Sequence, residues 1–149
     1  MSEPCPTERP LLTRARIGVL MGGQSAERDV SLRTGTAVHR SLVRRGYNAV
    51  AIDVGPTLCQ DLRDQKIDVV FLALHGPGGE DGAIQGFLET LGIPYTGSGI
   101  QASAIGMHKV TTKTLLTSAR IPVPAGTVVK RDEKISMSIV MKAAKLRLP

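Results

Sequence analysis

Residues 22–31, which read GGQSAERDVS, combine two glycines with polar side chains ahead of an expected helix. In such a turn, the backbone N–H groups at the start of the helix can face an anion. Glu27 lies between the preceding strand and the helix, where a carboxylate can face a bound ammonium group. The spacing is not GxGxxG, which disfavours a nicotinamide dinucleotide. A purely structural turn is the alternative interpretation of this motif.

Residues 75–82, HGPGGEDG, form a second stretch that could approach a ligand closely. Its four glycines in eight residues leave the backbone unshielded by side chains. We expect His75 to face the ligand. Glu80 and Asp81 come at the beginning of an expected helix, where a negative charge is favoured by the helix dipole, so we interpret them as structural.

Lys109 and Lys113 lie four residues apart on one face of an expected helix. An ammonium group at either position could contact a phosphate or a nucleobase. A solvated lysine face is the usual explanation for this spacing, and the spacing by itself leaves both interpretations open.

The elements that must position these residues alternate between strands and helices. Short apolar runs predict strands at residues 16–21, 47–54 and 68–74 and a short fourth strand at 92–95. Between them we expect a helix at residues 31–45, with Ser31 as N-cap, a short helix or a turn at 58–65, and a helix at 83–91. This order predicts an α/β fold with a doubly wound parallel sheet. Ligands bind such sheets beyond the carboxyl ends of the strands, where the glycine-rich segments 22–23, 76–82 and 97–99 should meet.

The pattern changes after residue 100. We expect helices at residues 102–107 and 110–119, a strand at 127–129 and a basic helical tail at 134–147. Two prolines at positions 122 and 124 suggest a domain boundary there. The expected organisation is therefore a loose leader over 1–15, an α/β substrate domain over 16–120, and the start of a second domain over 121–149.

Composition excludes several classes of protein. The 149 residues carry 19 Lys and Arg against 13 Asp and Glu, yet aromatic residues make up only 3%, too few for a surface that stacks nucleic-acid bases. The longest apolar stretch has six residues, whereas a membrane-spanning helix needs about 20. Cys5 and Cys59 have neither metal-binding nor CxxC spacing. We therefore expect a cytoplasmic protein that binds neither nucleic acid nor a membrane.

Three segments in this order carry a specific resemblance: GGQSAERDVSL, LALHGPGGEDGAIQGFLETLGIPYTGSG and ASAIGMHKVTTKTLL. Together they closely resemble the N-terminal part of the D-alanine–D-alanine ligases, ATP-grasp enzymes of peptidoglycan synthesis, cell wall biogenesis and cell shape. The resemblance runs from about residue 16 to the end of the chain. It implies a Rossmann-like pre-ATP-grasp domain, followed by the incomplete start of an ATP-grasp domain.

The resemblance also implies roles for individual residues. Glu27 matches the acid that holds the amino group of the first D-alanine, His75 matches a histidine near the carboxylate of that alanine, and Lys109 matches a lysine that reaches the nucleotide. The family usually has an acidic residue before that lysine, where this chain has His108.

By the same resemblance, the implied enzyme is an ATP-dependent carboxylate–amine ligase. It would use D-alanine, ATP and Mg²⁺ or Mn²⁺, and a homodimer is one assembly that it could form. The family's metal ligands and second ATP lysine have no match in these 149 residues, so we expect the chain alone to be catalytically incomplete. The alternative is a self-standing, non-catalytic module that binds a D-amino acid.

Overall fold

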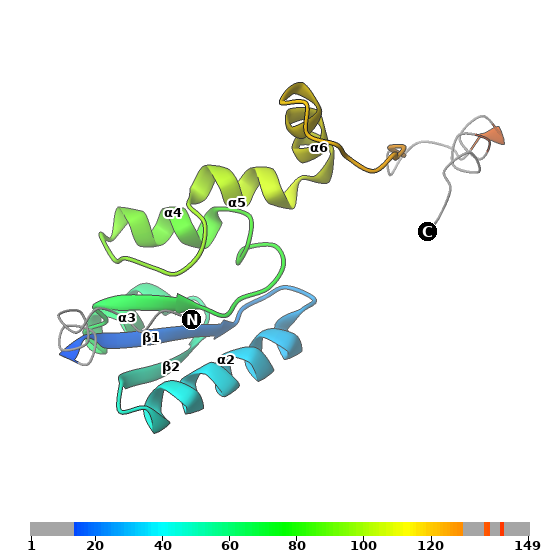
Figure 1. Ribbon diagram of the computed structural model, residues 1–149. Helices are drawn as coiled ribbons and strands as arrows, with labels where there is room; N and C mark the ends of the chain where they lie inside the picture. The colour runs from blue at the N-terminus through cyan, green and yellow to red at the C-terminus, as the bar shows by residue number, and fades with distance from the viewer. Residues whose placement is uncertain (1–13, 130–135, 138–140, 142–149) are drawn as a thin grey trace. The chain divides into compact units, whose positions relative to one another are not determined.

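The computed structural model describes residues 14–129, 136–137 and 141 (Figure 1). The chain divides into two units, Met1–Met107 and His108–Pro149. The first unit contains the sheet and helices α2 to α5, and the second contains α6 (Lys109–Ser118). The domain limits expected at residues 16–120 and 121–149 stay predictions, because a compact unit and a folding domain are different properties.

Strand β1 (Arg16–Gly22) lies at the centre of a parallel sheet, between β2 (Asn48–Val54) and β3 (Val69–Leu72). Leu20 of β1 lies opposite Ile52 of β2 and Leu72 of β3. All residues of β1 after the first are buried, as a strand covered on both faces requires. The predicted α/β fold with a parallel sheet is confirmed.

Helices cover both faces of the sheet (Figure 1). Helix α2 (Arg28–Arg44) packs on one face, where Val19, Met21 and Ala73 form a small buried cluster. Helices α3 (Leu58–Asp64) and α4 (Ala83–Thr90) pack on the other face. The larger cluster there consists of Leu20, Ile52, Leu58, Leu62, Ile67, Val70, Leu74, Ile84 and Leu88. Two buried clusters on opposite faces confirm that the sheet is doubly wound.

The predicted fourth strand is reduced to a single bridge between Val70 and Tyr95. The amide of Val70 donates to the Pro94 carbonyl at 2.8 Å, and the amide of Thr96 donates to the Val70 carbonyl at 3.0 Å. Pro94 has no N–H group with which to extend the ladder, and Gly92 has a left-handed φ of +69°. The short fourth strand predicted at residues 92–95 is therefore present only as this parallel bridge at Tyr95.

Two other boundaries differ from the predictions. Helix α2 begins at Arg28, with Glu27 rather than Ser31 in the N-cap position, because the hydroxyl of Ser31 bonds to the sheet instead. Residues 127–129 form no strand, since no described strand pairs with them. Helix α5 (Ile100–Met107) agrees with the sequence. Most of the expected leader and tail lie outside the described residues.

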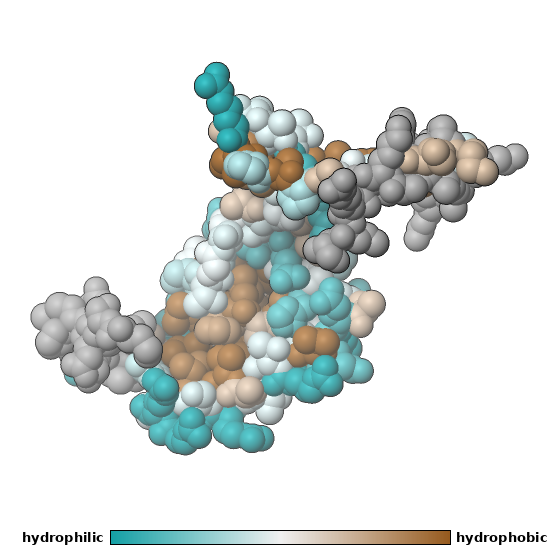
Figure 2. Space-filling model, turned by 45° about the vertical axis from the view of Figure 1, so that its right-hand side comes forward, coloured by the Kyte–Doolittle hydropathy of each residue, from teal (hydrophilic) through white to brown (hydrophobic). Residues whose placement is uncertain are grey.

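Apolar side chains also reach the surface. On the face shown in Figure 2, the largest group of hydrophobic residues is bordered by hydrophilic ones, and smaller groups lie elsewhere on the same face. The exposed large apolar residues of the first unit include Val30, Val43 and Ile100, and those of the second include Val110 and Leu115. In the part of the chain that the structure describes, no helix has the length and apolar character needed to cross a membrane.

Candidate functional site

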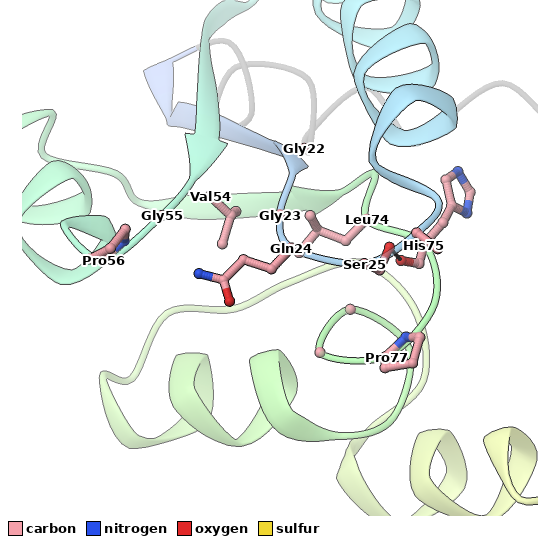
Figure 3. A pocket seen from close by; sticks show the side chains of 13 residues that line it. Gly22, Gly23, Gln24, Ser25, Val54, Gly55, Pro56, Leu74, His75 and Pro77 are labelled. Carbon is pink, nitrogen blue, oxygen red and sulfur yellow. Dashed lines mark hydrogen bonds between the residues drawn. The ribbon is translucent and has the colours of Figure 1, made fainter.

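A pocket of about 660 Å³ opens where the carboxyl ends of the three strands meet (Figure 3). Its walls come from the segments that follow β1, β2 and β3. They consist of Gly22, Gly23, Gln24, Ser25, Ala26, Val54, Gly55, Pro56, Leu74, His75, Pro77, Gly78 and Gly79. A neighbouring pocket of about 440 Å³ shares Leu74 and Gly79 and includes Gly97 and Ser98. The three glycine-rich segments thus meet at this edge of the sheet, as predicted.

Ser31 fixes the first loop to the sheet from inside α2. Its hydroxyl accepts a hydrogen bond from the Gly22 amide at 2.9 Å and donates one to the Ala73 carbonyl at 2.7 Å. The side chain is fully buried. Ser31 therefore joins the end of β1, the first turn of α2 and the segment after β3, and so sets the shape of the pocket edge.

Ser25 joins the two loops that carry the predicted site residues. Its hydroxyl donates to the His75 carbonyl at 2.7 Å and accepts from the Glu27 amide at 3.1 Å. Sequence reasoning did not single out Ser25. The sequence did contain a signal for it, because Ser25 lies two residues before an acidic residue in a polar turn. Serine side chains in such turns form hydrogen bonds with the nearby backbone.

Glu27 lies at the start of α2, and its side chain is exposed. A Cβ atom added to Gly76 would be 3.1 Å from its carboxylate oxygen Oε1, so the carboxylate lies directly over the backbone that follows His75. The structure thus brings Glu27 and the His75 loop together. Glu27 itself is not among the residues that line the larger pocket, although its neighbour Ala26 is.

His75 is held between α2 and its own loop. Its Nε2 atom is 3.3 Å from Thr34 Oγ1, and its Nδ1 atom is 3.7 Å from Glu80 Oε1. Figure 3 shows the ring turned toward α2 and away from the Leu74 side chain. Both ring nitrogens therefore face protein groups. That His75 faces a ligand stays a prediction.

Glu80 and Asp81 organise the second loop, which supports their structural interpretation. Glu80 Oε2 accepts from the Gly76 amide at 2.7 Å, and Asp81 Oδ2 accepts from the Gly78 amide at 2.8 Å. The bonds from the amides of Gly78 and Ala83 hold the pKa of Asp81 below its usual value. Because these carboxylates occupy the amides of Gly76 and Gly78, those two N–H groups are not offered to an anion.

Arg28 and Asp53 form an ion pair that sequence reasoning missed. Nη1 and Nη2 of Arg28 donate to Oδ1 and Oδ2 of Asp53 at 2.7 and 2.5 Å, and Nη1 also donates to the Gly23 carbonyl at 3.1 Å. A Cβ on Gly22, which has a φ of +78°, would lie 2.0 Å from Asp53 Oδ1. A side chain at Gly22 would therefore be strained by the left-handed backbone and would displace the Asp53 carboxylate.

The same pair shifts both ionisation equilibria. The hydrogen bond from Arg28 lowers the pKa of Asp53, and the bond to Asp53 raises the pKa of Arg28. The two side chains are 43% and 50% exposed, so the pair is accessible to water and salt. Its main effect is to tie the first turn of α2 to the end of β2.

Lys109 and Lys113 belong to the second unit. Both line a pocket of about 670 Å³, together with residues 126–128. Lys113 Nζ donates to the Pro124 carbonyl at 2.9 Å, and His108 caps α6 by accepting from the Thr111 amide at 3.2 Å. The ammonium of Lys113 is thus bonded within its own unit, while Lys109 lies at the start of the helix. Within the described ranges, no three or more His, Cys, Asp or Glu residues are grouped closely enough to hold a metal ion.

Comparisons with known proteins agree on one family. The family model described as the D-ala D-ala ligase N-terminus matches residues 58–98. The D-alanine–D-alanine ligase of Geotalea uraniireducens is 54% identical over 127 residues, which cover 85% of this chain and 41% of the relative. That of Desulforudis audaxviator is 60% identical over 109 residues, which cover 73% and 36%.

Solved structures give the same result. The D-alanine–D-alanine ligase of Bacillus anthracis complexed with ATP matches with a TM-score of 0.72 and 39% identity, over 86% of this chain and 44% of that one. The ligase of Coxiella burnetii matches with a TM-score of 0.68 and 27% identity, over 89% and 49%. This chain spans 41% and 36% of the two curated relatives and corresponds to their N-terminal part.

Proposed function

Since the chain belongs to the D-alanine–D-alanine ligase family, whose N-terminal portion it carries, we propose that it binds the first D-alanine of such a ligase. The observation that supports this most directly is the position of the Glu27 carboxylate over Gly76, beside the His75 loop. An acid and a histidine are thus brought together at the edge of a parallel sheet where ligands bind. The relatives named above are ligases, which favours the enzyme over a self-standing binding module.

In the proposed reaction, ATP phosphorylates the carboxylate of one D-alanine, and the amine of a second attacks the acyl phosphate and releases phosphate. Catalysis of phosphoryl transfer is largely positioning and neutralisation of charge. Glu27 would orient the ammonium group of the first D-alanine, through a charge-assisted hydrogen bond that contributes about 1.5–3 kcal/mol. His75 would lie near the carboxylate of the same molecule. Glu27 is an orienting group in this scheme and transfers no proton.

Lys109 is proposed to contact ATP. Its charge and its place on the wall of a pocket in the second unit suit a phosphate group. Mg²⁺ or Mn²⁺ is the proposed counter-ion of the nucleotide. Because the described residues contain no cluster of metal-ligating side chains, none of them is assigned as a ligand of this ion.

The proposed setting follows from family membership. We propose that the ligase acts in the cytoplasm in peptidoglycan synthesis, and so in cell wall biogenesis and cell shape. We propose D-alanine as the small-molecule partner of the protein and a homodimer as its assembly. We propose neither a nucleic acid nor a membrane as a partner. Residues 16–120 would form the substrate domain and residues 121–149 the beginning of the ATP-grasp domain.

A titration of the chain with D-alanine, followed by its amide NMR signals, tests the first-alanine site. D-alanine should shift signals of residues 25–28 and 75–80. Glu27→Gln should bind about tenfold more weakly, because a charge-assisted bond is lost. Asp64→Asn, which removes a carboxylate from α3, is the matched control and should bind like the parent chain. Equal D-alanine affinity in Glu27→Gln and the parent would show that the assignment is wrong.

Turnover can be measured in a fusion of this chain to the remaining part of the Geotalea uraniireducens ligase. We expect phosphate release from ATP that depends on D-alanine. Lys109→Ala should raise the KM for ATP more than the KM for D-alanine. If the two KM values rose equally, Lys109 would not be a nucleotide contact.

A further inference from the structure

Gln85 is a buried amide on the core-facing side of α4. It is 4% exposed, and Ile84 and Leu88 of the same helix are buried in the larger apolar cluster. Its Nε2 atom donates to the Gly79 carbonyl at 3.0 Å. Its Oε1 atom is buried with no hydrogen-bond partner among the residues that the structure describes. A buried acceptor without a partner costs free energy, so the amide of Gln85 is not explained by packing alone.

Gly79 links Gln85 to the segment that follows His75. The Gly79 amide donates to the Gly76 carbonyl at 3.1 Å, while the Gly79 carbonyl accepts from Gln85. Gly79 is also packed closely against the segment that follows β3, because a Cβ on it would lie 2.6 Å from the Cβ of Leu74. Movement of Gly79 would therefore move Gly76, over which the carboxylate of Glu27 lies.

The other bonds of this loop have a different role. The carboxylates of Glu80 and Asp81 bond the amides of Gly76 and Gly78 inside the loop, and Asp81 also accepts from the amide of Ala83 at the start of α4, so they set the shape of the loop and its junction with the helix. Ser25 ties the first residue of the loop to the neighbouring loop. The Gln85 bond joins the middle of the loop to a helix that is packed in the core.

We propose that Gln85 is a positioning residue, whose bond to the Gly79 carbonyl fixes the loop 75–82 on α4. This bond thereby keeps His75 and Gly76 correctly placed relative to Glu27 for binding of the first amino-acid substrate. This inference rests on the proposed function for its substrate. The placement of the loop by Gln85 can be tested without any ligand.

The test compares Gln85→Met with Ile84→Val in the whole chain. Methionine keeps the length and burial of Gln85 but removes the donor, whereas Ile84→Val trims a buried neighbour that makes no bond to the loop. In Gln85→Met, amide hydrogen exchange of Gly76, Gly79 and Glu80 should become at least about tenfold faster relative to the amides of β1. In Ile84→Val, the exchange rates of these three loop amides relative to the amides of β1 should stay as in the parent chain.

Binding gives the second readout. Gln85→Met should raise the dissociation constant for D-alanine several-fold, and Ile84→Val should leave it as in the parent chain. If the parent chain bound no D-alanine, the proposed function would fail, and the exchange ratio would still decide the role of Gln85. Unchanged exchange of the three loop amides in Gln85→Met would overturn the inference. Should Gln85→Met fail to fold, Gln85→Asn, whose shorter amide cannot span the same distance, must show the same loop-specific loss of protection.

Discussion

The hydroxyl of Ser25 donates a hydrogen bond to the carbonyl of His75, 50 residues away in the chain, at 2.7 Å. The same oxygen accepts from the amide of Glu27. One side chain therefore sets the spacing between the acid and the histidine of the candidate site. Because Ser25 bonds only the backbone of these two residues, a change at Ser25 tests the site while the side chains of Glu27 and His75 stay in place.

Ser25→Ala should weaken binding of D-alanine and lower stability modestly. It removes one hydrogen bond to the His75 carbonyl and one from the Glu27 amide, and exposed or half-buried bonds of this type contribute about 0.5–1.5 kcal/mol each. Urea denaturation measures the stability and NMR titration the affinity. Ser118→Ala, at an exposed position in α6, is the control and should change neither. A Ser25→Ala chain with unchanged affinity would show that the two loops do not act together.

Ser31→Ala should lower stability more than Ser25→Ala does. It leaves the Gly22 amide and the Ala73 carbonyl unpaired in a fully buried place, so we expect a loss of about 2–4 kcal/mol in the free energy of unfolding. Urea denaturation of Ser31→Ala and of Ser41→Ala, on the same helix, gives the comparison. A loss below about 1 kcal/mol would mean that water replaces both bonds.

Ser31 also shows where sequence reasoning stops. A serine before an apolar helical pattern predicts an N-cap, because its hydroxyl can accept from the backbone of the first turn. In the structure, this hydroxyl bonds to two strand ends instead, and one of its partners lies 42 residues away. A local pattern contains no information about such a distant partner. The Arg28–Asp53 pair escaped prediction for the same reason, since it joins α2 to the end of β2.

The strands and the location of the site were predictable because they depend on local and topological rules. The apolar runs of β1 and β3 are continuous, as buried parallel strands require, and glycines follow both. Parallel strands then bring their carboxyl ends to one edge. The bridge at Tyr95 shows the limit of this reasoning, since an apolar run with a proline inside it cannot extend a ladder.

Gly35→Ala should destabilise the first unit, although alanine is the better helix former. A Cβ on Gly35 would lie 2.5 Å from the Cβ of Met21, so α2 would have to move away from β1. Overpacking of this kind costs about 1–3 kcal/mol. Gly106→Ala in α5 is the matched control: its Cβ would meet nothing within 4 Å, so we expect stabilisation of about 0.5–1 kcal/mol. If both variants were stabilised in urea denaturation, the close packing of α2 on β1 would be wrong.

The acid sensitivity of the fold should depend in part on Asp53. Because Arg28 holds its pKa below the ordinary value of 3.8, Asp53 binds a proton less readily in the folded chain than in the unfolded one. Its contribution to stability is therefore complete above the unfolded pKa and is lost as the pH falls through the lower, folded pKa. The pKa of Asp81 is lowered in the same direction by its backbone hydrogen bonds.

Urea midpoints measured between pH 7 and pH 2 should fall less steeply in Asp53→Asn than in the parent chain. Salt should reduce that difference, since the pair is half exposed. Identical slopes in the two chains at low salt would show that the ion pair does not contribute to stability in solution.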